Sequence, residues 1–116
     1  MAVVITPVEG FDAKRNVSTV TAAAADTITL DMSVQNGVFL TFPAGNVTIA
    51  NPTNAAVGDE LYLELKQDSV GSRLVTWGAA FKKNTTLTTA ANAIDFVSFW
   101  YDGTNWIQTG NALNLA

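Results

Sequence analysis

The sequence predicts an all-β fold, a single antiparallel β-sandwich of the jelly-roll type with an extended N-terminal arm. Short runs in which apolar and polar residues alternate recur along the 116 residues. Gly, Pro, Asn and Asp separate these runs at intervals of about 10 residues, a spacing typical of sandwiches and jelly rolls. No window shows a helical period, and the one helix-like segment, Ala22 to Ala25, is too short to nucleate alone.

The length fits one domain with one hydrophobic core. We expect residues 1–16 to form the arm and residues 17–116 to form the β-sandwich. The first expected strands are 26–32, 38–42, 47–49 and 60–67, with Asn36-Gly37 turning the chain between the first two. In the fourth strand one face carries Leu61, Leu63 and Leu65, which predicts that these side chains are buried.

The second half of the chain continues the pattern. Strands are expected at 73–77, 94–101 and 105–109, and residues 82–93 form an irregular connection. The last two strands are joined by Asp102-Gly103-Thr104, a strong hairpin signal because Asp-Gly readily adopts positive φ.

Aromatic residues are concentrated near the last strands. On 94–101 one face carries Val97, Phe99 and Tyr101, and the other carries Phe96, Ser98 and Trp100. Two apolar faces indicate a central strand, with another subunit as one candidate cover for the second face. The Trp and Tyr side chains have two possible roles: core or interface packing, which is favoured, or a stacking platform for sugars. The set is Tyr62, Trp77, Trp100, Tyr101 and Trp106.

The charge pattern argues against a nucleic-acid partner. Charged residues make up only 14% of the chain, and the net charge is −4. Phosphate binding needs clustered Lys and Arg, whereas the six basic residues here are scattered: Lys14, Arg15, Lys66, Arg73, Lys82 and Lys83. A polar but weakly charged surface is what we expect of a protein that lies against other proteins.

The residue types argue against catalysis. The chain has no Cys and no His, which removes the usual nucleophiles, imidazole bases and zinc ligands. Most acids adjoin turns, and turn formation is their expected role: Asp26, Asp31, Asp59, Asp68 and Asp102. Asp102 to Asn105 lacks the further acids of a calcium loop. We therefore expect no enzyme activity, no cofactor and no metal.

The sequence has no apolar run of about 18 residues and no basic, apolar signal peptide at its start. We expect no membrane contact and no export by the ordinary route. In the arm, the apolar residues available to a partner are Val3, Val4, Ile5 and Phe11. Either the arm adds a strand to the sheet edge of a partner protein or a neighbouring subunit, or it folds onto its own domain as an edge strand.

Three linked segments resemble tailed-bacteriophage virion proteins. A strand that ends in Gln67-Asp68 is followed by a Gly71 turn and Val75-Thr76-Trp77. An Asp-initiated strand at 95–99 then closes through the hairpin Tyr101-Asp102-Gly103-Thr104. The resemblance covers about residues 26 to 109. It implies a jelly-roll-like domain, usually trimeric, in which the Gln-Asp and aromatic positions determine the fold.

The same resemblance implies two functions. The first is a capsid decoration (cement) protein, made in the host cytoplasm, that binds the major capsid protein on the outer surface of a phage head. In this case the arm residues named above would bind the capsid or a neighbouring subunit. We expect this one because the chain has its own Met1 and no shaft or heptad region. The alternative is a receptor-binding or carbohydrate-binding outer domain of a head fibre or tail fibre. In both cases a homotrimer is expected.

Overall fold

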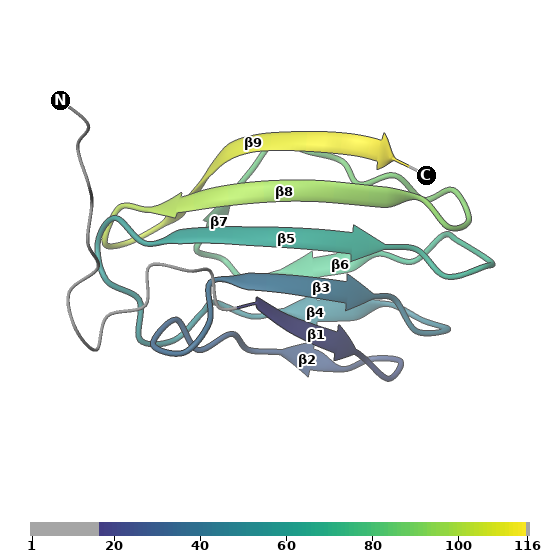
Figure 1. Ribbon diagram of the computed structural model, residues 1–116, viewed down its shortest axis with the longest axis horizontal. Helices are drawn as coiled ribbons and strands as arrows, with labels where there is room; N and C mark the ends of the chain where they lie inside the picture. Colours follow the sequence, from purple (N-terminus) through teal and green to yellow (C-terminus); the bar gives the residue numbers. More distant parts are fainter. Residues whose placement is uncertain (1–16, 116) are drawn as a thin grey trace, which may run out of the picture.

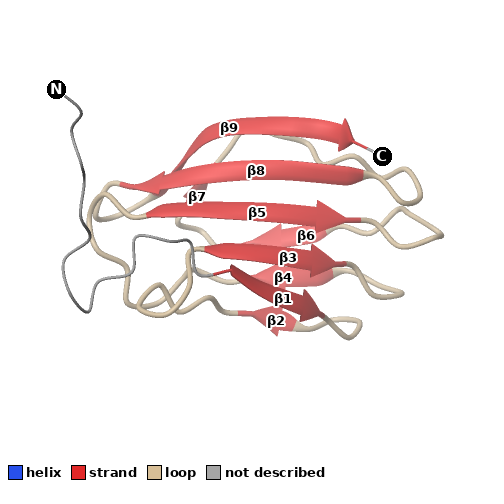
Figure 2. Cartoon of the chain, viewed as in Figure 1, coloured by secondary structure: helices blue, strands red, loops and turns tan. Residues whose placement is uncertain are grey.

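The structure, a computed structural model, describes residues 17–115, and that range contains nine β-strands and no helix (Figures 1 and 2). The expectation of an all-β fold is therefore confirmed. The strands are β1 (Val17–Thr21), β2 (Thr27–Ile28), β3 (Gly37–Thr41), β4 (Val47–Ile49), β5 (Glu60–Lys66), β6 (Val75–Trp77), β7 (Phe81–Lys82), β8 (Ile94–Tyr101) and β9 (Trp106–Leu115).

The strands form two sheets that lie face to face. One sheet has six strands in the order β1-β3-β5-β8-β9-β7, and the other has three in the order β2-β4-β6. Figure 1 shows the short sheet behind the β1–β5 half of the long one. The hydrophobic core lies between them, so the two-layer arrangement agrees with the sequence.

The first six strands are wound as successive coils. The chain runs along the six-stranded sheet, crosses at a turn and returns along the three-stranded sheet, three times in succession (Figure 1). As a result β1, β3 and β5 pair in parallel, and so do β2, β4 and β6. This arrangement is that of a β-solenoid.

The coiled path replaces the expected jelly-roll connections. Five of the seven strand pairings in residues 17–115 are parallel, whereas a jelly roll is antiparallel. Asn36-Gly37 does not close a hairpin, because β2 and β3 belong to different sheets. Alternation along a strand determines which residues face the core, but it does not determine the direction of the neighbouring strand.

The last strands close the stack with antiparallel pairing. β8 pairs with β5 on one side and with β9 on the other, so it is central as expected. The predicted hairpin between β8 and β9 is confirmed. The Asp102 carboxylate accepts hydrogen bonds from the backbone N–H groups of Thr104 and Asn105, and Gly103 has a φ of 101°. These bonds lower the pKa of Asp102 below its ordinary value.

The core follows the alternation of β5. Leu61, Leu63 and Leu65 are 0–2% exposed, as predicted. Leu63 lies between Val38 of β3 and Val97 of β8 in register, and both of these are also buried. Around this line the core is completed from both sheets by Leu30, Leu40, Phe42, Val47, Ile49, Phe81, Phe99 and Trp106.

Asparagine side chains fasten neighbouring coils at the corners of the short sheet. Asn46 Oδ1 accepts a hydrogen bond from the backbone N–H of Leu74, and Asn51 Oδ1 accepts one from Ala80. These bonds connect the two ends of β4 with the two ends of β6. Part of the role of the many asparagines is thus to accept hydrogen bonds from backbone N–H groups at turns.

Some strand boundaries differ from the sequence prediction. The expected strand 26–32 shortens to β2, after which Asp31 makes only an isolated bridge to Thr53. β1 and the two-residue β7 were not predicted, and β9 continues to Leu115 rather than ending at 109. Within residues 17–115 no helix could span a membrane.

Candidate functional site

The arm residues Val3, Val4, Ile5 and Phe11 lie outside the described residues, and the candidate sites are on the β-domain. Two surfaces qualify. One is the outer face of the six-stranded sheet, which points away from the core. The other is a hollow beside β6, called the Trp77 hollow below.

The outer face carries large apolar side chains from three strands. Phe39 of β3 is 47% exposed, Trp100 of β8 is 40%, Ile107 of β9 is 37% and Leu115 of β9 is 48%. The strand register places them on one face, because Trp100 pairs with Ile107 and Ile94 with Leu115. Half-buried Phe96 lies in the same cross-strand row as Phe39, with Glu64 between them.

The charges on this face are few. Glu60, Glu64 and Lys66 alternate outward along β5. Phe96 stacks on Tyr62 with ring centroids 6.1 Å apart. The outer face is therefore an apolar sheet surface with a line of charges along β5, and solvent-facing sheet surfaces in a monomer are usually polar.

The Trp77 hollow is held in shape by the residues that follow β5. Gln67 is buried, and its amide nitrogen donates to the carbonyl oxygens of Arg73 (2.8 Å) and Thr88 (3.2 Å). Its amide oxygen accepts a hydrogen bond from the Arg73 backbone N–H. Gln67 therefore joins the start of β6 to the connection 83–93. The irregular segment was predicted as 82–93, but Lys82 belongs to β7.

Asp68 and Gly71 complete this junction. The Asp68 carboxylate accepts hydrogen bonds from the Arg73 guanidinium and from the backbone N–H of Gly71, and the pKa of Asp68 is lowered by these bonds. A Cβ at Gly71 would lie 2.5 Å from the Thr89 carbonyl oxygen, so only glycine permits this close approach. The Gln-Asp pair is a fold determinant, as the resemblance implied.

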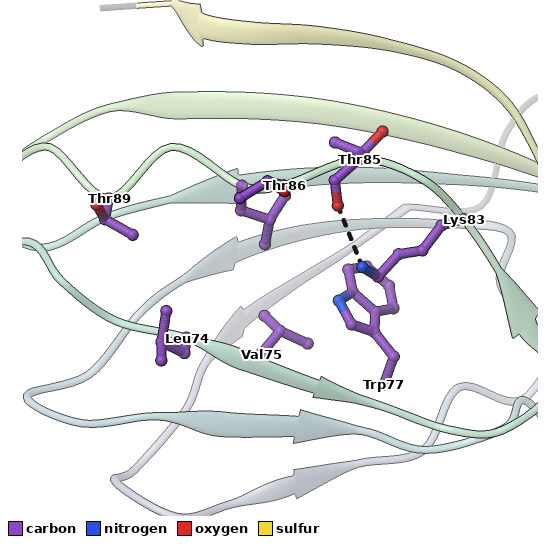
Figure 3. Close-up of a pocket in the computed structure, with 8 residues that line it drawn as sticks. Leu74, Val75, Trp77, Lys83, Thr85, Thr86 and Thr89 are labelled. Carbon is purple, nitrogen blue, oxygen red and sulfur yellow. Dashed lines mark hydrogen bonds between the residues drawn. The ribbon is translucent and has the colours of Figure 1, made fainter.

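The hollow itself lies between β6 and residues 83–89 (Figure 3). It measures about 250 Å³ and is lined by Leu74, Val75, Trp77, Lys83, Thr85, Thr86, Leu87 and Thr89. The Lys83 ammonium lies 5.3 Å from the centre of the Trp77 ring and donates a hydrogen bond to the Thr85 carbonyl oxygen. Thr86 and Thr89 are exposed at the rim.

The five Trp and Tyr side chains do not form a single sugar platform. Trp106 is buried in the core, where it stacks on Tyr101 at 4.8 Å. Trp100 faces outward on the long sheet, and Trp77 alone reaches the hollow. Packing is thus the main role of this set, as favoured from the sequence, and Trp77 is the exception.

The acidic residues act as turn formers. Besides Asp68 and Asp102, the carboxylates of Asp26, Asp31 and Asp59 each accept a nearby backbone N–H. Asp95 is buried, and its carboxylate accepts hydrogen bonds from the backbone N–H groups of Thr88 and Asn114. Among residues 17–115 no three acidic side chains gather in a way that could hold a metal ion.

Only part of these two surfaces is predictable from the sequence. The second apolar face of residues 94–101 predicts the β8 part of the outer face. No sequence pattern indicates that Phe39 also belongs to this face. The Trp77 hollow was missed, because it is assembled from β6 and a connection with no regular pattern. The threonines of residues 85–89 were a visible signal, since Ser and Thr hydroxyls are among the polar groups that orient ligands in pockets.

The fold and these two surfaces define a small all-β domain with a broad apolar outer face. A family model described as "Putative phage tail fibre C-terminal domain" matches residues 12–106. The match spans most of the chain, and the chain belongs to this family. The resemblance to phage virion proteins is confirmed, and the family makes the chain a structural component of a virion. No curated protein matches the chain.

Proposed function

We propose that this chain is the receptor-contacting outer domain of a phage tail fibre, acting by binding rather than by catalysis. The observation that carries the proposal is the family match over residues 12–106. The lack of His and Cys in the sequence supports the non-catalytic role. The family is described as a tail fibre domain, so the match favours the fibre function over decoration of the capsid surface.

The position of the protein on the virion distinguishes these functions. Antibodies raised against the purified domain and coupled to gold should label the tail of the parent phage in electron micrographs. The free domain should also slow adsorption of the phage to its host cells, because it occupies the receptor. Labelling of the head, with adsorption unchanged, would contradict the fibre proposal and support a decoration protein.

We further propose that copies of the chain associate through the outer face. A large apolar side chain has on the order of 150–250 Å² of surface, so the partly exposed side chains of this face leave on the order of 300–500 Å² uncovered. A flat face of this size suits another sheet better than a small ligand. Glu64 and Lys66 alternate on β5, so two copies could pair these charges across the contact. A trimer is expected from the resemblance.

Removal of the aromatic side chains tests this contact. The wild-type domain should elute with a mass near three times its 12.3 kDa in gel filtration coupled to light scattering. The double variant Phe39→Ser, Trp100→Ser should be a folded monomer, because both side chains are already exposed in one copy. The matched control is Val57→Ser, Val70→Ser, which removes two exposed apolar side chains from loops. A monomeric wild type at micromolar concentration would contradict the proposal.

A further inference from the structure

The Trp77 hollow has the construction of a small polar ligand site. The Trp77 ring is held from behind by the core: its centroid lies 5.1 Å from Phe81 in an edge contact and 5.7 Å from Phe99. A ring fixed in this way is a rigid, partly exposed apolar platform. Binding sites commonly combine such a wall with a few polar groups that set the orientation of the ligand.

The polar groups come from the connection that faces β6. Figure 3 shows Lys83 and Thr86 on the opposite side of the hollow from Leu74, Val75 and Trp77. The Lys83 ammonium uses one donor on the Thr85 carbonyl oxygen and has two more. The Thr85 hydroxyl cannot accept a further hydrogen bond, because Gln108 and Asn111 both donate to it, and Thr85 is buried.

The charge of the hollow is opposite to that of the protein. A second, more open depression is lined by Lys82, Lys83, Asn84 and Gln108, so Lys83 borders both. No carboxylate of residues 17–115 forms an ion pair with Lys82 or Lys83, whereas Arg73 is paired with Asp68. Two lysines next to each other on a chain with a net charge of −4 favour an anionic ligand.

We propose that the Trp77 hollow binds an acidic sugar unit of a bacterial surface polysaccharide. The apolar face of the sugar ring packs on Trp77, its carboxylate meets the Lys83 ammonium, and its hydroxyls reach Thr86 and Thr89. Lys83 now lies over the ring, and its flexible four-carbon stem allows it to swing to the rim when a sugar enters. This inference rests on the receptor-contacting function proposed above and assigns a ligand class to it.

The probe is oligogalacturonate, and its neutral control is the methyl ester of the same oligomer. Titration of the ¹⁵N-labelled domain should shift the Trp77 indole N–H signal, while those of buried Trp106 and outward-facing Trp100 stay in place. The ester should bind more weakly. Lys83→Gln should weaken oligogalacturonate binding about tenfold and leave ester binding unchanged, as expected for loss of one charge-assisted hydrogen bond.

The control variant is Lys66→Gln, which removes an exposed lysine from the outer face. Far-ultraviolet circular dichroism spectra of both variants should match the wild type, since both lysines are exposed and the domain is expected to stay folded without the outer-face contact. The inference is overturned if oligogalacturonate leaves the Trp77 signal unmoved, or if Lys83→Gln and Lys66→Gln bind it equally. A phage adsorption assay distinguishes failure of the sugar site from failure of the fibre proposal. A wild-type domain that blocks adsorption no better than the Lys83→Gln variant overturns the site alone, and a wild-type domain that does not block at all contradicts the fibre proposal itself.

Discussion

Replacing Leu63 by alanine is expected to lower the free energy of unfolding by about 2–5 kcal/mol. Leu63 is 1% exposed and lies in the middle of β5, between Val38 and Val97 on the neighbouring strands. The loss combines the transfer free energy of the deleted methyl groups with the cavity left among rigid neighbours. Because natural domains are stable by only about 5–15 kcal/mol, this one change should remove a large share of the total.

Urea titration followed by tryptophan fluorescence gives the unfolding free energy directly. The matched control is Val70→Ala, which truncates an apolar side chain that is 70% exposed in the β5–β6 loop. That change should stay within about 0.5 kcal/mol. If Leu63→Ala also costs less than about 0.5 kcal/mol, the core does not centre on β5.

Replacing Gln67 by leucine is expected to cost about 2–4 kcal/mol, although leucine is the more hydrophobic residue. The Gln67 amide is the hydrogen-bond partner of the Arg73 N–H, the Arg73 carbonyl and the Thr88 carbonyl in a nearly dry site. Leucine offers them no partner, and each buried polar group left unsatisfied costs about 1–3 kcal/mol. The lost junction should also loosen the connection that lines the Trp77 hollow.

Gln35→Leu provides the control, because Gln35 is a half-buried glutamine whose side chain makes no hydrogen bond within the described residues. The two variants change the same atoms, so the difference between their urea midpoints isolates the buried hydrogen bonds. Equal midpoints would show that the Gln67 amide contributes nothing beyond the packing of its side chain.

Local sequence signals were sufficient for the features that depend on neighbouring residues. The alternation of Leu61, Leu63 and Leu65 gave the buried face of β5, and Asp102-Gly103 gave the β8–β9 turn. Each of these signals lies within a few residues of the feature that it determines. Strand pairing between distant segments has no such local signal, which is why the jelly-roll path was expected in place of the coils.

A repeat in the short sheet would have revealed the parallel path. Thr27, Thr48 and Thr76 lie side by side in register, followed by Ile28, Ile49 and Trp77. Thr followed by a large apolar residue thus recurs once in each coil. Because the spacing between repeats varies and β2 has only two residues, the pattern is faint in the linear sequence. It becomes distinct only when the residues are aligned by coil.

The two candidate sites also differ in whether a local sequence signal predicts them. The outer face of β8 could be inferred from one strand, since alternation alone places Phe96 and Trp100 together. The Trp77 hollow could not, because Gln67, Arg73 and Thr88 must first bring β6 and the 83–89 connection side by side. Sites assembled from irregular segments depend on these tertiary hydrogen bonds, and no periodicity encodes them.

The two ends of the coil stack differ in a way that bears on how such domains vary in length. At one end β8 pairs antiparallel with β5 and β9 pairs antiparallel with β8, which ends the run of coils in the long sheet. At the other end β1 and β2 are the outermost strands of their sheets. Each coil contacts mainly the coils beside it, so stability accumulates coil by coil. Duplication or loss of one internal coil would therefore change the height of the stack and leave the terminal hairpin, with Trp100 and Trp106, in its present surroundings. The number of coils and the side chains of the terminal β8–β9 hairpin can thus change independently in this architecture.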